Sequence, residues 1–466
     1  MRAMTDAVVE RCIQHIATSG QQPSCGDVDA AALCRAMREP APEQGVGPSG
    51  LDPLLDQLFR DWIPRSLTTI GPGYLAYIPG GGIYPAALAD FIANTTNRFT
   101  GVWFAAPALV QLEANALDWL REWMGFPPAT RGLFTTGGSM ATFNAIVCAR
   151  ERHLGAEIRR GTLYTSDQAH HSVMKAAKLA GIMADRVRAI ASDDRYRLRM
   201  DALAEAIAAD RRGGLTPFAV VSSAGTTNTG AVDPLDEIAD LCAREGLWHH
   251  VDGAYGAFFY LCDELRHVLK GLSRADSLTL DPHKGMFLPY GTGALLVRNG
   301  AALRAAHAAT AAYLPETPDP EDFYDPSQHG PELSRGFPGL RVWLSVKLYG
   351  AAAFRDAIAE KRALAFAACE RLARLPGVVL DAPPELSLFA FHVTWAGATR
   401  ADEDAATRRL LDGTTARGRV MITGCTAKDR YLGRVCVLSF RTHQLHIDAL
   451  VEDVAAALAD IVPVRR

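Results

Sequence analysis

The chain has 466 residues, of which 48% are hydrophobic and 21% are charged, so it can bury a large core in two or three packed units. A formal net charge of -4 with dispersed Lys and Arg argues against nucleic acid or an anionic membrane as a partner and favours a small molecule. The nine cysteines show no CxxC pairing or grouping with histidine, which predicts reduced thiols and no metal site.

The N-terminal region is predicted to be an arm, residues 1–83, that needs another surface to pack on. Its first twenty residues, MRAMTDAVVERCIQHIATSG, have a helical rhythm without a continuous apolar run. No segment of the chain approaches the roughly eighteen apolar residues of a membrane span. A Pro- and Gly-rich stretch at 38–50 separates short helical patterns. These features predict a cytoplasmic protein with no membrane partner.

Residues 84–345 alternate helical patterns with short β-rich runs, which predicts a mostly parallel sheet covered by helices on both faces. The β-rich runs lie at 131–138, 161–167, 218–227, 247–254, 276–284 and 293–300. Residues 346–466 contain a long helical pattern, two strand-like runs at 386–395 and 434–443, and a final helix. This second pattern predicts a smaller C-terminal α+β domain.

The end of the first β-rich run has the composition of a phosphate cradle. Gly137 and Gly138 allow a ligand to approach the backbone, and Ser139 adds a hydroxyl beside the first amides of the following helix. No GK[ST] follows, so this is not a Walker loop, and by itself it could be only a tight βα turn.

Polar residues of complementary kinds follow three other runs, at the edge where parallel sheets bind ligands. His170 could stack on a flat ring, Thr227 offers a hydroxyl, and Asp252 offers a carboxylate next to the small residue Ala254. Taken alone, these could be a loop histidine, a turn threonine and a helix cap.

The run at 276–284 ends in Asp281, His283 and Lys284. A lysine in a partly desolvated site can become a neutral amine that forms a Schiff base, whereas a lone lysine is usually a solvated charge. A phosphate cradle, a ring stacker, a hydroxyl, a carboxylate and a nucleophilic amine together match the needs of pyridoxal 5'-phosphate (PLP). The sequence therefore predicts a PLP enzyme.

The motifs SDQAHHSV, HVDGAYGAF and DPHKG, in this order, resemble those of the group II PLP-dependent amino-acid decarboxylases, which include aromatic-L-amino-acid, histidine and glutamate decarboxylases. The resemblance runs from about residue 50 to the C-terminus. It implies the fold-type I, aspartate aminotransferase-like α/β fold, and a homodimer whose sites draw on both subunits.

The resemblance also implies roles for individual residues. Lys284 would hold the cofactor covalently, Asp252 would partner its pyridine nitrogen, and His170 would stack on its ring. Ala254 would form the opposite wall, and Thr227 would lie near the phenolic oxygen. The phosphate side would comprise Gly138, Ser139, Asp281 and His283. Asp281 stands where relatives often have asparagine.

A Pro- and Asp-rich segment after the lysine corresponds to the family's mobile loop. Tyr313 falls on the tyrosine that is thought to protonate the substrate carbon after carbon dioxide leaves. Arg335 matches an arginine at the end of the loop and is expected among the cofactor-binding residues, but Gly336 stands where the family usually has a second arginine.

The resemblance implies decarboxylation of an aromatic or related L-amino acid to an amine and carbon dioxide, with Lys284, His170, Tyr313 and Asp252 as catalytic residues. Relatives of the family instead use oxygen to form an aldehyde or perform elimination on modified amino acids, so both remain alternatives. Transamination and a non-enzymatic scaffold are further possibilities.

The substrate pocket is expected to draw on the segments GYLAYIPGGG and, from the partner subunit, NRFTGVW. The predicted pocket residues are Tyr77, Ile78, Gly80, Arg98, Phe99 and Gly101. Arg98 could bind an acidic substrate group, although a structural or interface arginine is the alternative.

Overall fold

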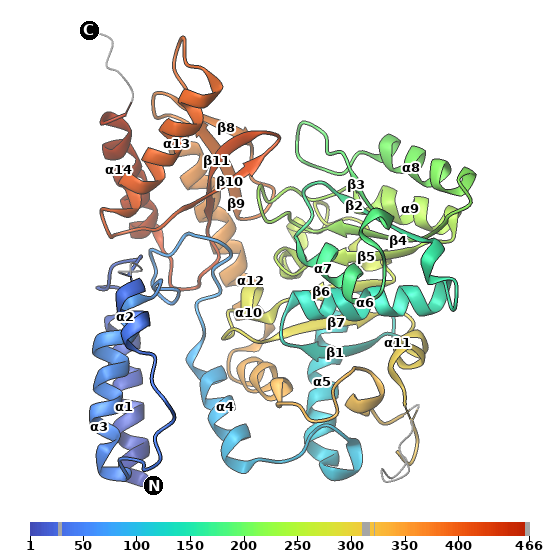
Figure 1. Ribbon diagram of the computed structural model, residues 1–466, viewed down its shortest axis with the longest axis horizontal. Coiled ribbons are helices and arrows are strands. Elements are labelled where there is room, and N and C mark those ends of the chain that lie inside the picture. Colours follow the sequence, from blue (N-terminus) through green and yellow to red (C-terminus); the bar gives the residue numbers. More distant parts are fainter. Residues whose placement is uncertain (27–29, 310–316, 321, 462–466) are drawn as a thin grey trace. The chain divides into compact units, whose positions relative to one another are not determined.

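The computed structural model describes residues 1–26, 30–309, 317–320 and 322–461 (Figure 1). It divides into two compact units. The first unit comprises Met1–Gly81, Leu364–Leu380 and Phe391–Arg466, and the second comprises Gly82–Ala363 and Asp381–Ala390. The division into 1–83, 84–345 and 346–466 stays a prediction, because each unit combines separate stretches of the chain.

The second unit is built on a seven-stranded sheet with the order β1-β7-β6-β5-β4-β2-β3. Its strands are β1 (Arg131–Thr135), β2 (Gly161–Ser166), β3 (Val187–Ile190), β4 (Thr216–Ser223), β5 (Trp248–Asp252), β6 (Ser277–Leu280) and β7 (Gly293–Val297). Strand β7 runs antiparallel to β1 and β6, whereas the other neighbours are parallel. The predicted mostly parallel sheet is confirmed.

Strand β3 was not expected from the sequence. It has only four residues, lies at the edge of the sheet and carries Arg188, so its apolar pattern is weak. The guanidinium of Arg188 pairs with the carboxylate of Asp210 at 2.6 Å, a contact that no local pattern reveals.

The sheet has a separate hydrophobic core on each face. Leu163 and Val221 belong to one core, whereas their chain neighbours Tyr164 and Val220 belong to the other. Because successive side chains of a strand point to opposite faces, the two cores lie on opposite sides of the sheet.

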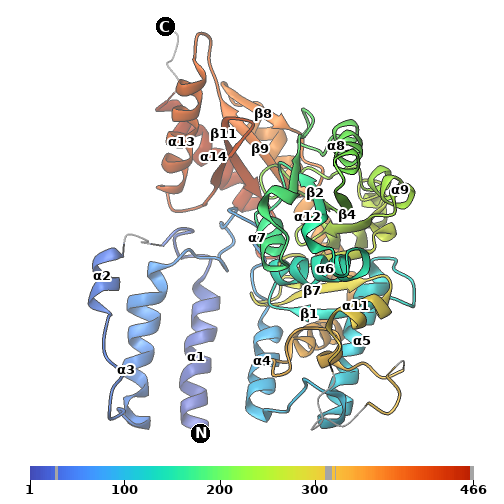
Figure 2. The same ribbon diagram turned by 45° about the vertical axis from the view of Figure 1, so that its right-hand side comes forward.

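Helices from different parts of the second unit complete these cores, as Figures 1 and 2 show. Helices α6 (Gly138–His153), α7 (Ser172–Leu179) and α11 (Gly300–His307) contribute to the first core, and α8 (Met200–Arg212) and α9 (Leu235–Glu245) contribute to the second. The other helices are α4 (Tyr84–Thr96), α5 (Pro107–Trp123), α10 (Pro282–Gly285) and α12 (Pro338–Leu372), which is interrupted at Gly350.

The first unit contains a four-stranded sheet with the order β10-β11-β9-β8. The strands are β8 (Val378–Ala382), β9 (Leu388–Val393), β10 (Thr423–Ala427) and β11 (Arg430–Cys436), and α13 (Arg400–Thr415) packs on α14 (Gln444–Ala459). The predicted smaller α+β part is therefore present, and β8, β10 and α13 add to the elements expected from the sequence.

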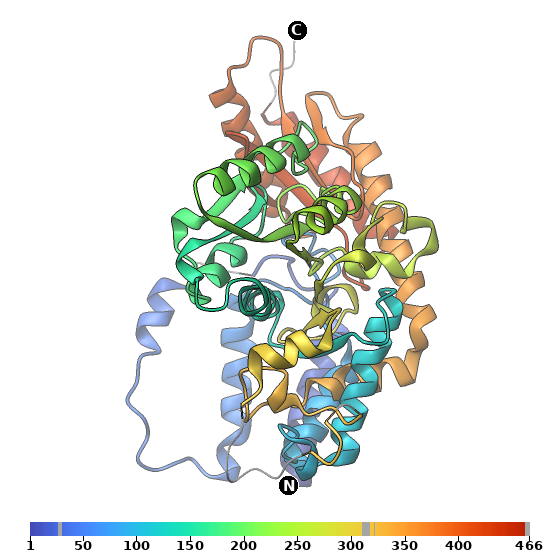
Figure 3. The ribbon, with the colours of Figure 1, turned by 90° about the vertical axis from the view of Figure 1, so that its right-hand side faces the viewer.

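The N-terminal helices of the first unit are α1 (Arg2–Thr18), α2 (Ala31–Ala36) and α3 (Leu51–Asp56). Helices α1 and α3 lie side by side (Figure 2), and Arg11 pairs with Asp52 and Asp56 between them. The connection from α2 to α3 forms the long blue loop in Figure 3. No helix within the described ranges is both long and apolar enough to cross a membrane.

Candidate active site

The turn from β1 into α6 brings the predicted phosphate cradle together. Gly137 adopts a φ of 151°, which favours glycine. A Cβ added to Gly138 would lie 3.1 Å from both the Ala254 Cβ and the Asp281 Oδ2, so the start of α6 lies directly against these two residues. Ser139 is exposed in the first turn of the helix, where backbone N–H groups and the helix dipole favour an anion.

The lysine of the DPHKG motif lies beside a buried carboxylate. The Lys284 Nζ is 2.9 Å from the Asp281 Oδ2, and the Asp281 side chain is only 2% exposed. The His283 Nδ1–H donates to the carbonyl of Thr292 at 2.8 Å, and its Nε2 lies 3.5 Å from Asp281. Burial lowers the pKa of His283. Three sequence-predicted residues therefore form one contiguous polar group.

Asp252 ends β5 and is half-buried. The backbone N–H of Ala254 donates to its Oδ1 at 3.1 Å. Burial raises the pKa of the Asp252 carboxyl, although the Lys284 ammonium acts in the opposite direction. A carboxylate in this setting is suited to a cationic N–H partner, since a positive group would restore its ionised form.

His170, in the loop after β2, is held by Ser172. The backbone N–H of Ser172 donates to the His170 Nδ1 at 3.3 Å, and the Ser172 hydroxyl lies 2.7 Å from the same nitrogen. Burial, together with the neighbouring His171 and Lys284, lowers the pKa of His170 to about 4. The imidazole is therefore neutral at pH 7, with its proton on Nε2.

Of the two threonines after β4, one has a structural role. The Thr226 hydroxyl lies 2.9 Å from the Thr229 hydroxyl and accepts the N–H of Ala231, and the Thr226 residue is 1% exposed. Thr227 is only half-buried, so it is the threonine of the pair that can reach a ligand.

These residues fit PLP. The Oδ1 of Asp281 is buried and has no hydrogen-bond partner among the described residues, so a ligand donor would satisfy it. Glycine at position 138 lets the start of α6 approach Ala254 and Asp281 closely, the exposed Ser139 and the first amides of α6 suit a phosphate, and Lys284 supplies a primary amine. The Asp252 carboxylate can pair with a protonated ring nitrogen of PLP.

Arg335 and Tyr313 stay predictions as site residues. Arg335 forms a buried ion pair with Glu113, which also accepts the N–H of Gly339. Burial alone would lower the pKa of Arg335, but the Glu113 carboxylate raises it. Tyr313 lies outside the described residues, so its role stays a prediction.

The predicted pocket residues are divided between the two units. Tyr77, Ile78 and Gly80 lie in the first unit, and Arg98, Phe99 and Gly101 lie in the second. Tyr77 and Phe99 are 54% and 42% exposed, and Ile78 is nearly buried. A side chain at Gly101 would collide with the Leu333 carbonyl, so glycine there permits close backbone packing.

The residues that hold His170 and His283 in place are not among the site residues predicted from the sequence. The position of Ser172 could have indicated its contact, because it follows His170 by two residues in the motif SDQAHHSV. Thr292 and Arg341 carried no local signal: Arg341 donates to the Thr292 hydroxyl at 2.7 Å and to Asp90 at 2.6 Å. These contacts join segments that are distant in sequence.

Two buried histidines of β5 predict a pH-dependent stability. Burial lowers the pKa of His249 and of His250 from 6.5 to about 3. Because the unfolded chain takes up these protons at higher pH, the free energy of unfolding should fall as the pH drops from about 6.5 toward 3. His249→Gln should reduce the number of protons taken up on unfolding by about one. The slope of the unfolding free energy against pH should therefore fall by about 1.4 kcal/mol per pH unit near pH 5. Urea unfolding at several pH values across this range measures the slope, and an unchanged slope in His249→Gln would contradict a lowered pKa for His249.

The fold and site define a PLP-dependent enzyme, and comparison with known proteins specifies the family. Residues 51–394 match the pyridoxal-dependent decarboxylase conserved domain. The chain is 35% identical to an aromatic-L-amino-acid decarboxylase of Bacillus atrophaeus, over 98% of this chain and 96% of that protein. It is 30% identical to a tryptophan decarboxylase of Camptotheca acuminata, over 94% and 90% of the two chains.

A solved structure gives the same result. The crystal structure of Oryza sativa TDC with PLP and tryptamine matches with a TM-score of 0.93 and 26% identity, covering 99% of this chain and 98% of that chain. The chain belongs to the pyridoxal-dependent decarboxylase family. It is an amino-acid decarboxylase that uses PLP, and the predicted fold-type I architecture is confirmed.

Proposed function

We propose that the enzyme converts an aromatic L-amino acid to the corresponding amine and carbon dioxide. The observation that carries the proposal is the group formed by Lys284, Asp281 and Asp252 at the strand ends: the Lys284 amine lies 2.9 Å from the buried carboxylate of Asp281, and its charge also acts on the carboxyl of Asp252. The names of the relatives from Bacillus atrophaeus and Camptotheca acuminata support the aromatic substrate class.

The residues of the site would have separate roles in the proposed reaction. PLP, when bound, supplies an aldehyde that bonds to amines and a protonated ring that accepts electrons. The Lys284 amine would hold the cofactor covalently, and Asp252 would keep a proton on the ring nitrogen. The amides at the start of α6, with Ser139 and His283, would bind the phosphate. Thr227 would donate a hydrogen bond to the phenolic oxygen.

Proton delivery completes the reaction. When the bond from the substrate α-carbon to its carboxylate breaks, carbon dioxide departs and the α-carbon must gain a proton. The Tyr313 hydroxyl donates this proton. Neutral His170 would stack on the cofactor ring, with Ala254 as the opposite wall, and can donate a hydrogen bond through its Nε2–H, which suits orientation better than general acid catalysis.

A substrate panel tests the proposal. With holoenzyme, kcat/KM for L-tryptophan, L-tyrosine or L-phenylalanine should exceed that for L-glutamate by at least about a hundredfold, because a carboxylate side chain would be desolvated without a partner. A preference for L-glutamate would contradict the aromatic class. In that case the exposed Arg98 becomes the expected carboxylate partner, and Arg98→Ala should abolish the preference.

The enzyme is also proposed to be a homodimer. Helix α4 exposes Leu88, Phe91 and Ile92 at helical spacing, and these side chains are 38%, 54% and 46% exposed. Sedimentation should therefore give twice the chain mass of 50.2 kDa. Phe91→Glu should raise the dimer dissociation constant at least about tenfold, since a charge at an interface core is strongly unfavourable. Leu179→Glu, at a 70% exposed position of α7, is the matched control. An active wild-type monomer would contradict the proposal.

A cytoplasmic location is the final part of the proposed function. All nine cysteines lie in the described part of the chain and are free thiols. Several are buried, and free thiols in this number are typical of a reducing compartment.

A further inference from the structure

The turn between strands β8 and β9, together with the adjoining ends of both strands, belongs to a different unit from the chain on either side of it. Residues 381–390 cluster with the second unit, whereas 364–380 and 391–466 belong to the first. The contacts of this segment within the second unit reach the two loops that carry Asp252 and Thr227.

The central contact is a buried hydrogen bond between Tyr255 and Ser387. The backbone N–H of Ser387 donates to the Tyr255 hydroxyl at 2.8 Å, and the Ser387 hydroxyl lies 3.0 Å from the same oxygen. Tyr255 is 4% exposed and Ser387 is fully buried. Because water cannot reach this buried site, loss of the Tyr255 hydroxyl would leave the backbone N–H of Ser387 without an acceptor.

The neighbouring Leu386 fills the space between the two loops. A Cβ at Gly225 would lie 3.2 Å from the Leu386 Cδ1 and 2.5 Å from the Tyr255 Cδ1, and a Cβ at Gly256 would lie 2.5 Å from the same leucine methyl. Gly225 has a φ of 101°, which also favours glycine. The side chains of Tyr255 and Leu386 therefore pack directly on the backbone before Thr227 and after Asp252.

The two loops are also joined to each other. The N–H of Ala224, at the end of β4, donates to the backbone carbonyl of Asp252 at 2.8 Å. A Cβ at Gly230, at the far end of the Thr227 loop, would lie 2.8 Å from the carbonyl oxygen of Leu388. The segment thus contacts the Thr227 loop at both ends and the turn that follows Asp252.

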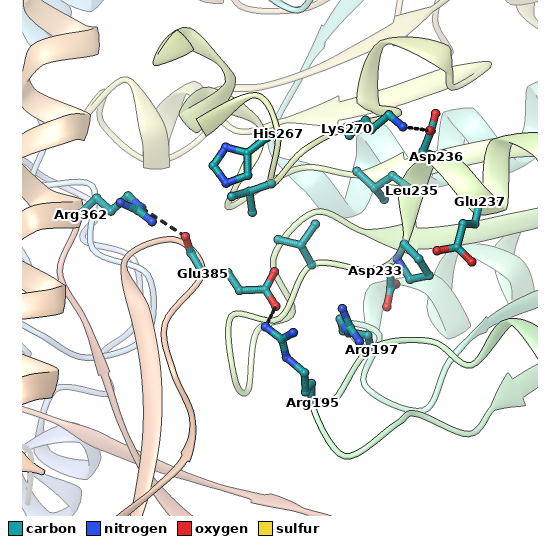
Figure 4. Close-up of a pocket in the computed structure, with 13 residues that line it drawn as sticks. Arg195, Arg197, Asp233, Leu235, Asp236, Glu237, His267, Lys270, Arg362 and Glu385 are labelled. Atoms are coloured by element: carbon teal, nitrogen blue, oxygen red, sulfur yellow. Dashed lines mark hydrogen bonds and ion pairs between the residues drawn. The ribbon is translucent and has the colours of Figure 1, made fainter. Parts of the chain in front are cut away.

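Charged residues anchor the outer end of the segment, as Figure 4 shows. Glu385 lies between two arginines: the Arg195 Nη2 is 3.5 Å from its carboxylate, and the Arg362 Nε donates to its backbone carbonyl at 3.2 Å. These residues line a pocket of about 440 Å³ in which Lys270 also pairs with Asp236 at 2.8 Å. Of these contacts, those of Arg195 and Arg362 hold Glu385, and with it the outer end of the segment, at the edge of the pocket.

We infer that Tyr255 is a positioning residue, which uses its hydrogen bond to Ser387 to hold Asp252 and Thr227 in the geometry that binds the cofactor. The inference rests on the roles proposed above for Asp252 and Thr227. Tyr255 itself acts through the backbone of the two loops and does not touch the reacting atoms. A loosened hydrogen bond should therefore weaken cofactor binding before it affects the fold.

The test compares PLP binding by Tyr255→Phe and by a matched control. Tyr255→Phe keeps the ring on Gly225 and removes only the hydroxyl, so the dissociation constant of PLP from the apoenzyme should rise about tenfold, as for one buried hydrogen bond. Tyr164→Phe removes another buried hydroxyl, which donates to Asp210 at 2.7 Å within the core formed by α8 and α9. The control should lower stability and leave PLP affinity within about twofold of wild type.

Further readouts separate positioning from a general loss of stability. In PLP-saturated Tyr255→Phe, the visible circular dichroism of the bound cofactor should weaken and kcat should fall while KM changes little. Ser387→Ala keeps the N–H donor and should have a smaller effect than Tyr255→Phe. If Tyr255→Phe does not fold, Leu386→Val provides the test, because it shortens the side chain between the loops and should also raise the dissociation constant.

The possible outcomes are distinguishable. An unchanged PLP affinity in Tyr255→Phe, or in Leu386→Val if the first variant is unfolded, would overturn the inference while wild type still binds PLP and releases carbon dioxide. An equal loss of affinity in Tyr164→Phe would also overturn it. If wild type itself forms no covalent PLP adduct, the proposed function fails instead.

Discussion

Lys284→Ala is expected to abolish decarboxylation and covalent cofactor attachment. In the proposed function the primary amine of Lys284 bonds to the cofactor aldehyde, and alanine offers no nucleophile in its place. Turnover should fall by more than about a thousandfold, as is typical when a covalent catalyst is removed. Borohydride reduction followed by peptide mapping should label Lys284 in wild type and leave the corresponding peptide of the variant unlabelled.

A second variant separates chemistry from folding. Lys284→Ala leaves the buried carboxylate of Asp281 without the ammonium that lies 2.9 Å away, and loss of one partner of a buried pair can cost about 3–5 kcal/mol. Lys284→Arg retains a cation there but has no amine that can form the bond. It should be folded and equally inactive, whereas Lys270→Ala, at an exposed ion pair, should behave as wild type. A reducible adduct in Lys284→Arg would rule out the assignment.

Asp252→Asn is expected to have the next largest effect. In the proposed function the Asp252 carboxylate keeps the cofactor ring nitrogen protonated, and the amide of asparagine cannot balance that positive charge. The value of kcat should fall about 100- to 1000-fold, the range seen when one preorganised electrostatic contact at a reacting group is lost. Stopped-flow measurement of carbon dioxide release at saturating PLP and substrate gives this rate.

A cofactor analogue checks the cause of the Asp252→Asn effect. PLP methylated at the ring nitrogen carries a permanent positive charge, so it should restore part of the rate in Asp252→Asn. Asp236→Asn, which removes the half-buried carboxylate that pairs with Lys270 and Arg274, is the matched control and should retain wild-type kinetics. A wild-type rate in Asp252→Asn would show that this carboxylate does not support the ring nitrogen.

The sheet and its strand-end residues were predictable because their signals are local. The β-rich runs that precede Gly138, Asp252 and Lys284 are short, apolar and bounded by Gly, Asp or Pro. Strands of a parallel sheet end at a common edge, so residues far apart in sequence were expected to converge there. The contact between Gly138, Ala254 and Asp281 agrees with that expectation.

The supporting contacts were not predictable from local patterns. The carbonyl of Thr292 that holds His283, and the Ser387 amide that holds Tyr255, come from segments whose positions depend on the packed fold. Strand β3 was missed because it carries the charged Arg188, whose ion-pair partner Asp210 is distant in sequence. Arg335 likewise gave no sequence signal for its buried partner Glu113.

The measurement that tests the central claim most directly is the product stoichiometry of the purified holoenzyme with an aromatic L-amino acid. The predicted result is one carbon dioxide and one amine per substrate consumed, without hydrogen peroxide or aldehyde. Formation of aldehyde with hydrogen peroxide, or consumption of substrate without carbon dioxide release, would contradict simple decarboxylation.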